Sequence, residues 1–231
     1  PDSVMRRAMA EADVGDDVLD HDPTMAALEE AVAGLLGFES ALWVPSGSMG
    51  NMIALMLHLQ RGDRFLAPEH AHVLGSELGT AAWLAGGMPD ALPHDGGPGR
   101  PLASTVRAKA GGAGPYFTLR TTLLSLENTH NFAGGAAFGP AEWAELVAAG
   151  RDCGLSIHLD GARLWNAAVA LDVPIASLAA GADTVQVCLS KGLGAPVGSM
   201  LVSDSARIHE ARRVRKMLGG GVRQGGVLAA A

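Results

Sequence analysis

Short apolar stretches alternate along this chain with segments whose apolar residues keep helical spacing, and this alternation constrains the fold most. The stretches at residues 122–126, 155–159 and 184–189 are separated by helical patterns such as residues 140–149. Strands that alternate with helices form parallel sheets covered on both faces, because each crossover helix packs back onto the sheet. The sequence therefore predicts an α/β fold with a mainly parallel sheet.

The N-terminal part follows the same order. A pattern of helical spacing begins at Pro23 and closes at Gly37, as expected for a helix with proline at its start and glycine at its end. A short apolar stretch at residues 41–44, a Ser-Gly turn and a second helical pattern through Leu59 come next. This order predicts a strand, a tight turn and a helix.

The segment at residues 94–114 is rich in Gly, Pro and Ala, and it predicts a loop, a helix at residues 103–110 and a second loop. The sequence as a whole shows no internal repeat.

Composition narrows the function classes. With 48% hydrophobic and 18% charged residues over 231 positions, the chain can build one sizeable buried core. A net charge of −7 repels phosphate backbones, so we expect a small-molecule ligand and no nucleic acid. The apolar runs are too short to span a membrane, and the first residues do not have the order of a signal peptide.

The two cysteines, Cys153 and Cys188, have apolar neighbours in the sequence and no metal-ligand spacing. They predict buried thiols of a reducing compartment, and hence a cytoplasmic protein without a metal site.

Two charged residues follow predicted strands, where ligands of parallel sheets bind. Asp160 ends one apolar stretch, and a carboxylate there can keep a pyridine nitrogen protonated; the alternative is a helix N-cap. Lys191 follows the next stretch, and its amine can form an imine with an aldehyde; the alternative is a solvated lysine. Their separation by one strand-helix-strand unit favours the functional interpretation of both.

Further polar residues lie near strand ends. Backbone N–H groups at Ser46, Gly47 and Ser48 form an anion site suited to a phosphate, or an ordinary capped turn. His72, five residues before Glu77, is expected to stack on a planar cofactor or to move a proton, although a structural histidine is an alternative.

The run at residues 127–131 concentrates polar groups directly after a strand. There, His130 is expected to move protons and Asn128 to hydrogen-bond a ring oxygen. A basic helix at residues 207–216 leads into a glycine turn that carries Arg223. Arg223 is suited to reach a phosphate, including one across a subunit interface; a solvated basic face is the alternative.

Taken in order, several motifs resemble the low-specificity threonine aldolases. They cover residues 15–18, 22–24, 46–51, 127–131, 158–163, 188–199 and 216–231, and the string at residues 190–199 is the most specific. The resemblance implies a fold-type-I pyridoxal phosphate enzyme with a seven-stranded, mainly parallel sheet. It also implies a homodimer or homotetramer. On this basis residues 1–231 are the large domain, with an N-terminal segment and a small C-terminal domain missing.

The resemblance also implies the roles of the cofactor-binding residues. Lys191 forms the Schiff base with pyridoxal 5'-phosphate, Asp160 pairs with the pyridinium and His72 stacks on the ring. The phosphate is held by the turn of Ser46, Gly47 and Ser48.

For the substrate, the resemblance implies that Arg163 binds its carboxylate or a cofactor oxygen and that His130 lies by its β-hydroxyl. Lys216 and Arg223 approach from a neighbouring subunit. The expected reaction splits L-threonine or L-allo-threonine into glycine and acetaldehyde, with a base near His72, His130 or Glu77. Two alternatives are a β-eliminating lyase of the same fold type and a truncated, inactive homologue.

Three positions depart from the family pattern: Leu19 replaces a tyrosine, Ser76 an aromatic residue, and Phe132 an arginine of some members. These departures concern substrate binding, because every cofactor motif is intact.

Overall fold

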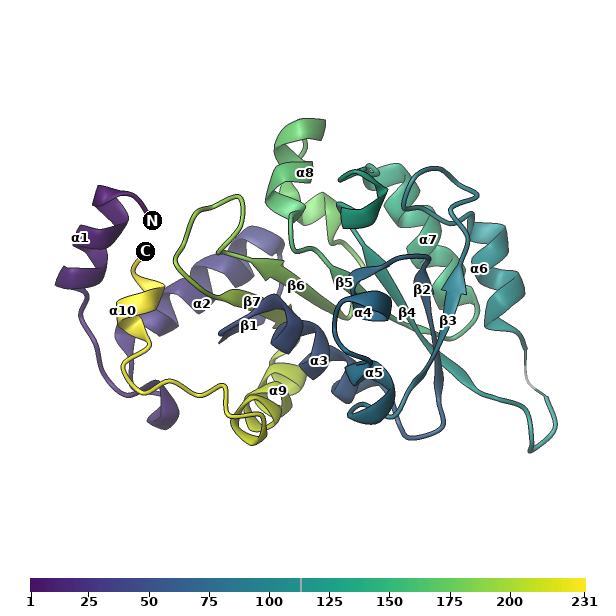
Figure 1. The fold of residues 1–231 in the computed structure, drawn as a ribbon, viewed down its shortest axis with the longest axis horizontal. Helices are drawn as coiled ribbons and strands as arrows, with labels where there is room; N and C mark the ends of the chain where they lie inside the picture. The colour runs from purple at the N-terminus through teal and green to yellow at the C-terminus, as the bar shows by residue number, and fades with distance from the viewer. Residues whose placement is uncertain (113) are drawn as a thin grey trace.

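In the computed structural model, which describes residues 1–112 and 114–231, seven strands form one sheet in the order β1-β7-β6-β5-β4-β2-β3 (Figure 1). The strands are β1 (Ser40–Val44), β2 (Arg64–Pro68), β3 (Met88–Leu92), β4 (Thr121–Glu127), β5 (Ser156–Asp160), β6 (Thr184–Cys188) and β7 (Ser199–Ser203). Neighbours from β6 to β3 are parallel, whereas β7 is antiparallel to both β1 and β6. The predicted mainly parallel sheet is confirmed.

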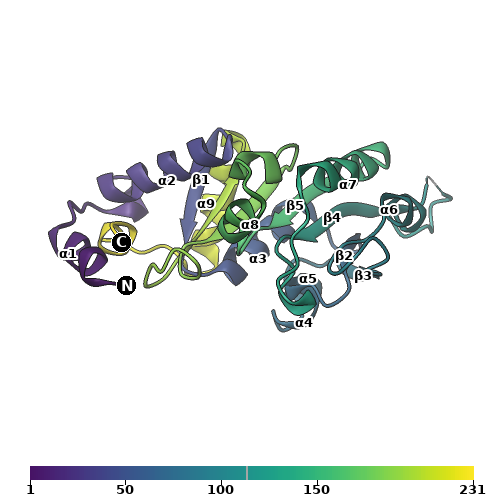
Figure 2. The same cartoon turned by 90° about the horizontal axis from the view of Figure 1, so that it is seen from above.

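Helices connect the strands and cover both faces of the sheet. The longer ones are α1 (Ser3–Glu11), α2 (Pro23–Leu36), α3 (Gly47–His58), α6 (Ala103–Ala110), α7 (Pro140–Asp152), α8 (Leu164–Leu171) and α9 (Ser205–Met217). Single turns are η1 (Asp17–Leu19), α4 (His72–Gly75), α5 (Thr80–Trp83), η2 (Asn131–Ala133), η3 (Ile175–Leu178) and α10 (Gly226–Ala229). Figure 2 shows α2 and α7 on one side of the sheet and α4 and α5 on the other. Both termini lie side by side, at α1 and α10 (Figures 1 and 2).

The core lies on the two faces of the sheet. On one face, α2, α6, α7 and α8 pack against the strands through side chains such as Trp143 and Leu146. On the other face, α3 and α9 pack against β1 and β7 through Ile53 and Ile208. Removing these apolar surfaces from water drives the assembly of the layers.

The predicted helices correspond to α2, α3, α6, α7 and α9, and the predicted strands to β1, β4, β5 and β6. The sequence pattern does not mark β3, because this edge strand contains Pro89 and Asp90 and lacks an apolar run. The loop predicted after α6 includes residue 113, which lies outside the described residues. Among the residues described, no helix is both long and apolar enough to cross a membrane.

The burial predicted for the cysteines is correct for one of them. Cys188 is buried, but Cys153 is half-buried, because it caps the C-terminal end of α7 near the surface; both are free thiols.

Helix α7 packs closely on the sheet at Gly150. A Cβ atom there would come within 2.5 Å of Ile157 Cδ1 and 3.2 Å of Leu124 Cδ2, both in fully buried side chains. Gly150→Val is therefore expected to lower the free energy of unfolding by about 1–3 kcal/mol, measured by urea denaturation.

Gly34→Val provides the matched control, because an added Cβ in this exposed position of α2 has no heavy atom within 4 Å. Its effect is expected to stay below about 0.5 kcal/mol. Equal losses in the two variants would contradict the close packing of α7.

Candidate active site

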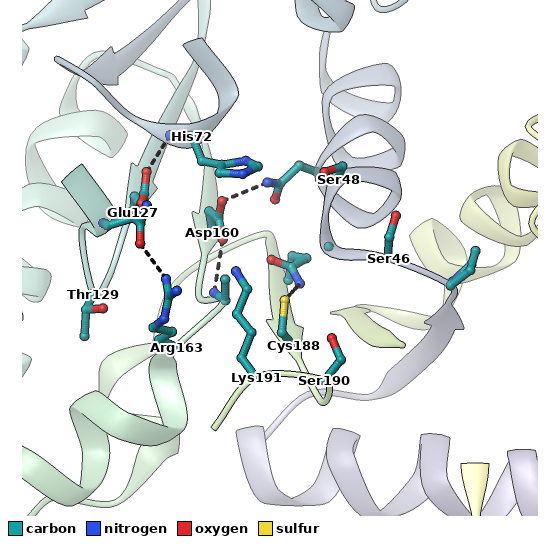
Figure 3. A pocket seen from close by; sticks show the side chains of 16 residues that line it. Ser46, Ser48, His72, Glu127, Thr129, Asp160, Arg163, Cys188, Ser190 and Lys191 are labelled. Atoms are coloured by element: carbon teal, nitrogen blue, oxygen red, sulfur yellow. Dashed lines mark hydrogen bonds between the residues drawn. The ribbon is translucent and has the colours of Figure 1, made fainter. Parts of the chain in front are cut away.

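A pocket of about 360 Å³ lies at the carboxyl edge of the sheet. Its walls come from the segments that follow β1, β2, β4, β5 and β6, because parallel strands end at the same edge. The lining residues are Pro45, Ser46, Gly47, Ser48, Asn51, His72, Glu127, Thr129, Asn131, Asp160, Ala162, Arg163, Gln186, Cys188, Ser190 and Lys191 (Figure 3).

The pocket brings the predicted carboxylate and amine together. Asp160 is the last residue of β5 and is 5% exposed, while Lys191 follows β6 and is exposed at the pocket. Figure 3 shows the Lys191 side chain directed toward Asp160. The backbone N–H of Ala162 donates to Asp160 Oδ1 at 3.0 Å, which holds the carboxylate in place.

Asn51 of α3 links Asp160 to a second buried carboxylate. Its Nδ2 donates to Asp160 Oδ2 and to Glu77 Oε1, both at 2.8 Å. A ring nitrogen of His72 and one carboxylate oxygen each of Glu77 and Asp160 lie within 4.8 Å of one another. A metal ion would require a similar spacing. The Asn51 amide accounts for this close approach, because its two N–H groups point one to each carboxylate.

A chain of neutral polar groups supports Asn51 from behind. His158 Nε2 lies 3.2 Å from Asn51 Oδ1, and His158 Nδ1 lies 2.8 Å from Thr184 Oγ1, which in turn lies 3.0 Å from His58 Nε2. Burial lowers the pKa of His158 to about 3 and that of His58 to about 4. Asn51 Oδ1 can only accept, so the neutral His158 ring donates to it from Nε2 and accepts the Thr184 hydroxyl at Nδ1. The Thr184 oxygen in turn accepts from Nε2 of the neutral His58 ring.

His72 lines the pocket with its ring backed by Glu77. The Nδ1 atom of His72 lies 2.8 Å from Glu77 Oε1, and this hydrogen bond raises the pKa of His72 above its usual value despite partial burial. Glu77 itself lies behind the ring and borders a neighbouring cavity.

The predicted anion site stands at the start of a long helix. Helix α3 begins at Gly47, and Ser46 Oγ accepts the N–H of Met49 at 3.2 Å. A Cβ on Gly47 would come within 2.9 Å of Cys188 Sγ, so only glycine allows the helix to start this close to β6. Ser46, Gly47 and Ser48 line the pocket, so the free N–H groups at this helix start belong to residues of its wall.

Arg163 and Glu127 form the opposite wall. Arg163 Nη1 donates to Asn131 Oδ1 at 2.8 Å. Glu127 ends β4 directly opposite Asp160 in the strand register. Burial, together with the Asp160 charge, raises the pKa of Glu127 to about 7.

Besides Glu77, two further residues predicted to act at the site, Asn128 and His130, do not line the pocket. The Asn128 side chain is bonded at both ends to the backbone of Phe138, with Nδ2 donating at 3.0 Å and Oδ1 accepting at 3.4 Å, so it is not directed at a ring oxygen. His130 is fully buried, and its ring centroid lies 4.9 Å from that of His94. Among the described residues, neither His130 ring nitrogen has a hydrogen-bond partner, and burial lowers its pKa to about 4.

The two basic residues near the C-terminus also lie elsewhere in this chain. Lys216 borders a separate cavity of about 590 Å³ next to η1, and Arg223 forms an ion pair with Asp16. Their predicted approach from a neighbouring subunit stays a prediction. Leu19, Ser76 and Phe132, the three departures from the family pattern, are exposed and lie outside the pocket lining.

Sequence reasoning missed Asn51, His158 and a role for Glu127. Asn51 follows the Ser-Gly-Ser turn and His158 lies in an apolar strand, so a polar residue inside a predicted buried element was the available signal.

A sequence model of the beta-eliminating lyases matches residues 1–231. The chain belongs to this family. Within it, the chain is 44% identical over its whole length to low-specificity L-threonine aldolase 1 of Arabidopsis thaliana, of which it covers 65%. It is 41% identical, again over its whole length, to the low specificity L-threonine aldolase of Escherichia coli K12, of which it covers 68%. The resemblance seen in the motifs is confirmed.

Solved structures confirm the fold of this family member. The threonine aldolase of Leishmania major superposes with a TM-score of 0.85 at 20% identity, covering 99% of this chain and 67% of the other. A putative L-allo-threonine aldolase from Listeria monocytogenes gives 0.83 at 22% identity, covering 98% and 62%. The chain thus spans about two thirds of these proteins, and the fold-type-I architecture predicted from the sequence is the one observed.

The polar chain behind Asn51 predicts a pH dependence of stability. The folded-state pKa of His58, about 4, lies below the value of about 6.5 in an unfolded chain. Between these values the unfolded state binds a proton that the folded state excludes, so His58 costs stability as pH falls from about 6.5 to about 4. His58→Gln keeps the N–H donor for Thr184 without titrating.

We expect the stability of His58→Gln to rise relative to wild type as pH falls through this range, by up to about 1.4 kcal/mol per pH unit. Urea denaturation at several pH values measures the difference. His209→Gln, on the exposed surface of α9, is the control and should run parallel to wild type. A constant difference between His58→Gln and wild type would contradict the neutral histidine.

Proposed function

We propose that residues 1–231 are the cofactor-binding large domain of a pyridoxal phosphate-dependent threonine aldolase, which cleaves L-threonine or L-allo-threonine to glycine and acetaldehyde. One observation carries the proposal: the Lys191 amine, the Asp160 carboxylate and the start of α3 share one pocket. The 41% identity to the E. coli threonine aldolase supports the same reaction.

The pocket residues fit pyridoxal phosphate. Its aldehyde needs an amine, its ring nitrogen an acid and its phosphate a group of N–H donors, and the pocket contains all three. Gly47 lets α3 start close to Cys188 of β6, so the N–H donors of this helix start border the same pocket as Lys191. Two buried lining atoms, Gln186 Oε1 and Thr129 Oγ1, have no hydrogen-bond partner among the described residues, as expected where a polar ligand binds.

Lys191 would hold the cofactor through its amine, and Asp160 would face the ring nitrogen. Bound pyridoxal phosphate supplies an electron sink for the bonds of the substrate α-carbon. Asn51 and the Ala162 N–H donate to Asp160 and hold it in place, where it would pair with the protonated ring nitrogen. The His72 ring would lie against the cofactor.

Arg163 would bind the substrate carboxylate in a charge-assisted pair. Since His72 Nδ1 is bonded to Glu77, its Nε2 would receive the proton of the β-hydroxyl group, with Glu77 stabilising the imidazolium. This geometry favours His72 over His130, which is buried outside the pocket lining.

A homodimer or homotetramer is part of the proposal, with Lys216 and Arg223 acting on the pocket of a neighbouring subunit. Their distance from the pocket lining of their own chain supports this arrangement. The free thiols of Cys153 and Cys188 support a cytoplasmic location.

The test is cofactor binding followed by product analysis. We expect purified protein to bind pyridoxal phosphate with a visible absorbance change, and to release glycine and acetaldehyde from threonine. Lys191→Ala should lower the rate on the order of 10³-fold, since it removes the group that reacts with the cofactor.

Lys109→Ala is the matched control, because Lys109 pairs with Asp90 outside the pocket and its loss should leave the rate unchanged. Ammonia and an α-keto acid as products would instead identify a β-eliminating lyase. A protein that binds no cofactor would contradict the proposal.

A further inference from the structure

Glu127 connects parts of the pocket that are distant in the sequence. It is the last residue of β4 and is 4% exposed. Its Oε2 accepts the backbone N–H of His72 at 2.7 Å, and its Oε1 accepts the backbone N–H of Asn131 at 2.8 Å. Both carboxylate oxygens are therefore used by backbone donors, one from each of two separate segments.

Each donor opens a short turn that lacks a cap of its own. His72 is the first residue of α4, and Asn131 is the first residue of η2. Neither Ala71 nor His130, the residues in the N-cap positions, provides a side-chain acceptor. The free N–H groups of a helix start need such an acceptor, so Glu127 acts as a shared cap for both turns.

The two turns support two groups that line the pocket, the His72 ring and the Arg163 guanidinium. The first turn carries the His72 ring. The second carries Asn131, whose Oδ1 holds Arg163 Nη1 at 2.8 Å. The Glu127 carboxylate is thus bonded directly to the backbone of His72. It is also bonded to the backbone of Asn131, whose side chain holds Arg163.

We propose that Glu127 is a positioning residue for the reaction, because its carboxylate sets the placement of the His72 ring relative to the Arg163 guanidinium. This inference rests on the proposed function, in which His72 contacts the cofactor and Arg163 the substrate carboxylate. Capping both turns requires one side chain with two oxygen atoms that each accept a backbone N–H, and only a carboxylate provides them.

Glu127→Gln tests this with little change in size. Its amide keeps one acceptor oxygen and turns an NH₂ group toward the other backbone N–H, so one turn loses its cap. We expect amide hydrogen exchange to accelerate about tenfold in the peptide that contains His72 or in the one that contains Asn131. We also expect KM for threonine to rise and kcat to fall, each about tenfold or more, because a misplaced group weakens both binding and reaction.

Two further variants sharpen the test. Glu127→Asp keeps the charge but is one methylene shorter, so it should restore part of the exchange protection and of kcat. Glu142→Gln is the matched control, because its carboxylate accepts the Gly139 N–H at 2.9 Å at the start of α7, outside the pocket lining. It should leave exchange at His72 and Asn131, and both kinetic constants, at wild-type values.

The outcomes separate this inference from the proposed function. Wild-type kinetics in Glu127→Gln would overturn the positioning role, even if exchange were faster, because the carboxylate would then be only structural. Unchanged exchange at both peptides would overturn it as well. A wild-type protein that neither binds pyridoxal phosphate nor cleaves threonine would refute the proposed function, which the exchange data do not address. If Glu127→Gln does not fold, Glu127→Asp carries the same comparison.

Discussion

The buried carboxylate of Asp160 is the group around which the pocket is arranged. An ionised carboxylate is costly to bury unless hydrogen bonds replace its water. Here the Ala162 N–H and the Asn51 amide donate to it, one to each oxygen. Two further carboxylates, Glu77 and Glu127, lie nearby and are held in the same way by amide donors. Three carboxyl groups are thus held close together at this edge of the sheet, and Asp160 is the one that would face a cationic ring nitrogen.

The support behind Asp160 is rigid because it belongs to the sheet. His158 and Thr184 face each other in the register of β5 and β6, two residues before Asp160 and Gln186. Their hydrogen bond therefore forms wherever the two strands pair correctly. Asn51 reaches this pair from α3, so the position of Asp160 depends on strand register and on helix packing together. Sites held on such elements keep their geometry better than sites built on loops.

This arrangement requires glycine at a few closely packed positions. Gly47 allows α3 to start against Cys188, and Gly50 allows the same helix to pass over the side chain of Gln186, since a Cβ there would lie 2.7 Å from its Cγ. Larger side chains would push α3 away from β6 and move both the anion site and Asn51. The glycines of the Ser-Gly-Ser-Met-Gly-Asn motif thus serve packing, besides the phosphate binding that we propose for this turn.

Local sequence determined the alternation of strands and helices, except at β3, and which polar residues end a strand. For that reason Asp160, Lys191, Arg163 and the turn at Ser46 could be predicted, since parallel strands bring their carboxyl ends to one edge. Only the tertiary structure decided where the polar side chains after those strands point. It placed Asn128 against the backbone of Phe138 and His130 beside His94, and it joined Asn51, His158 and Glu127 to the site. The reason is physical: the sequence period reveals which face of an element is apolar, but the partner of a buried polar group lies on another element and is found only when the layers have packed.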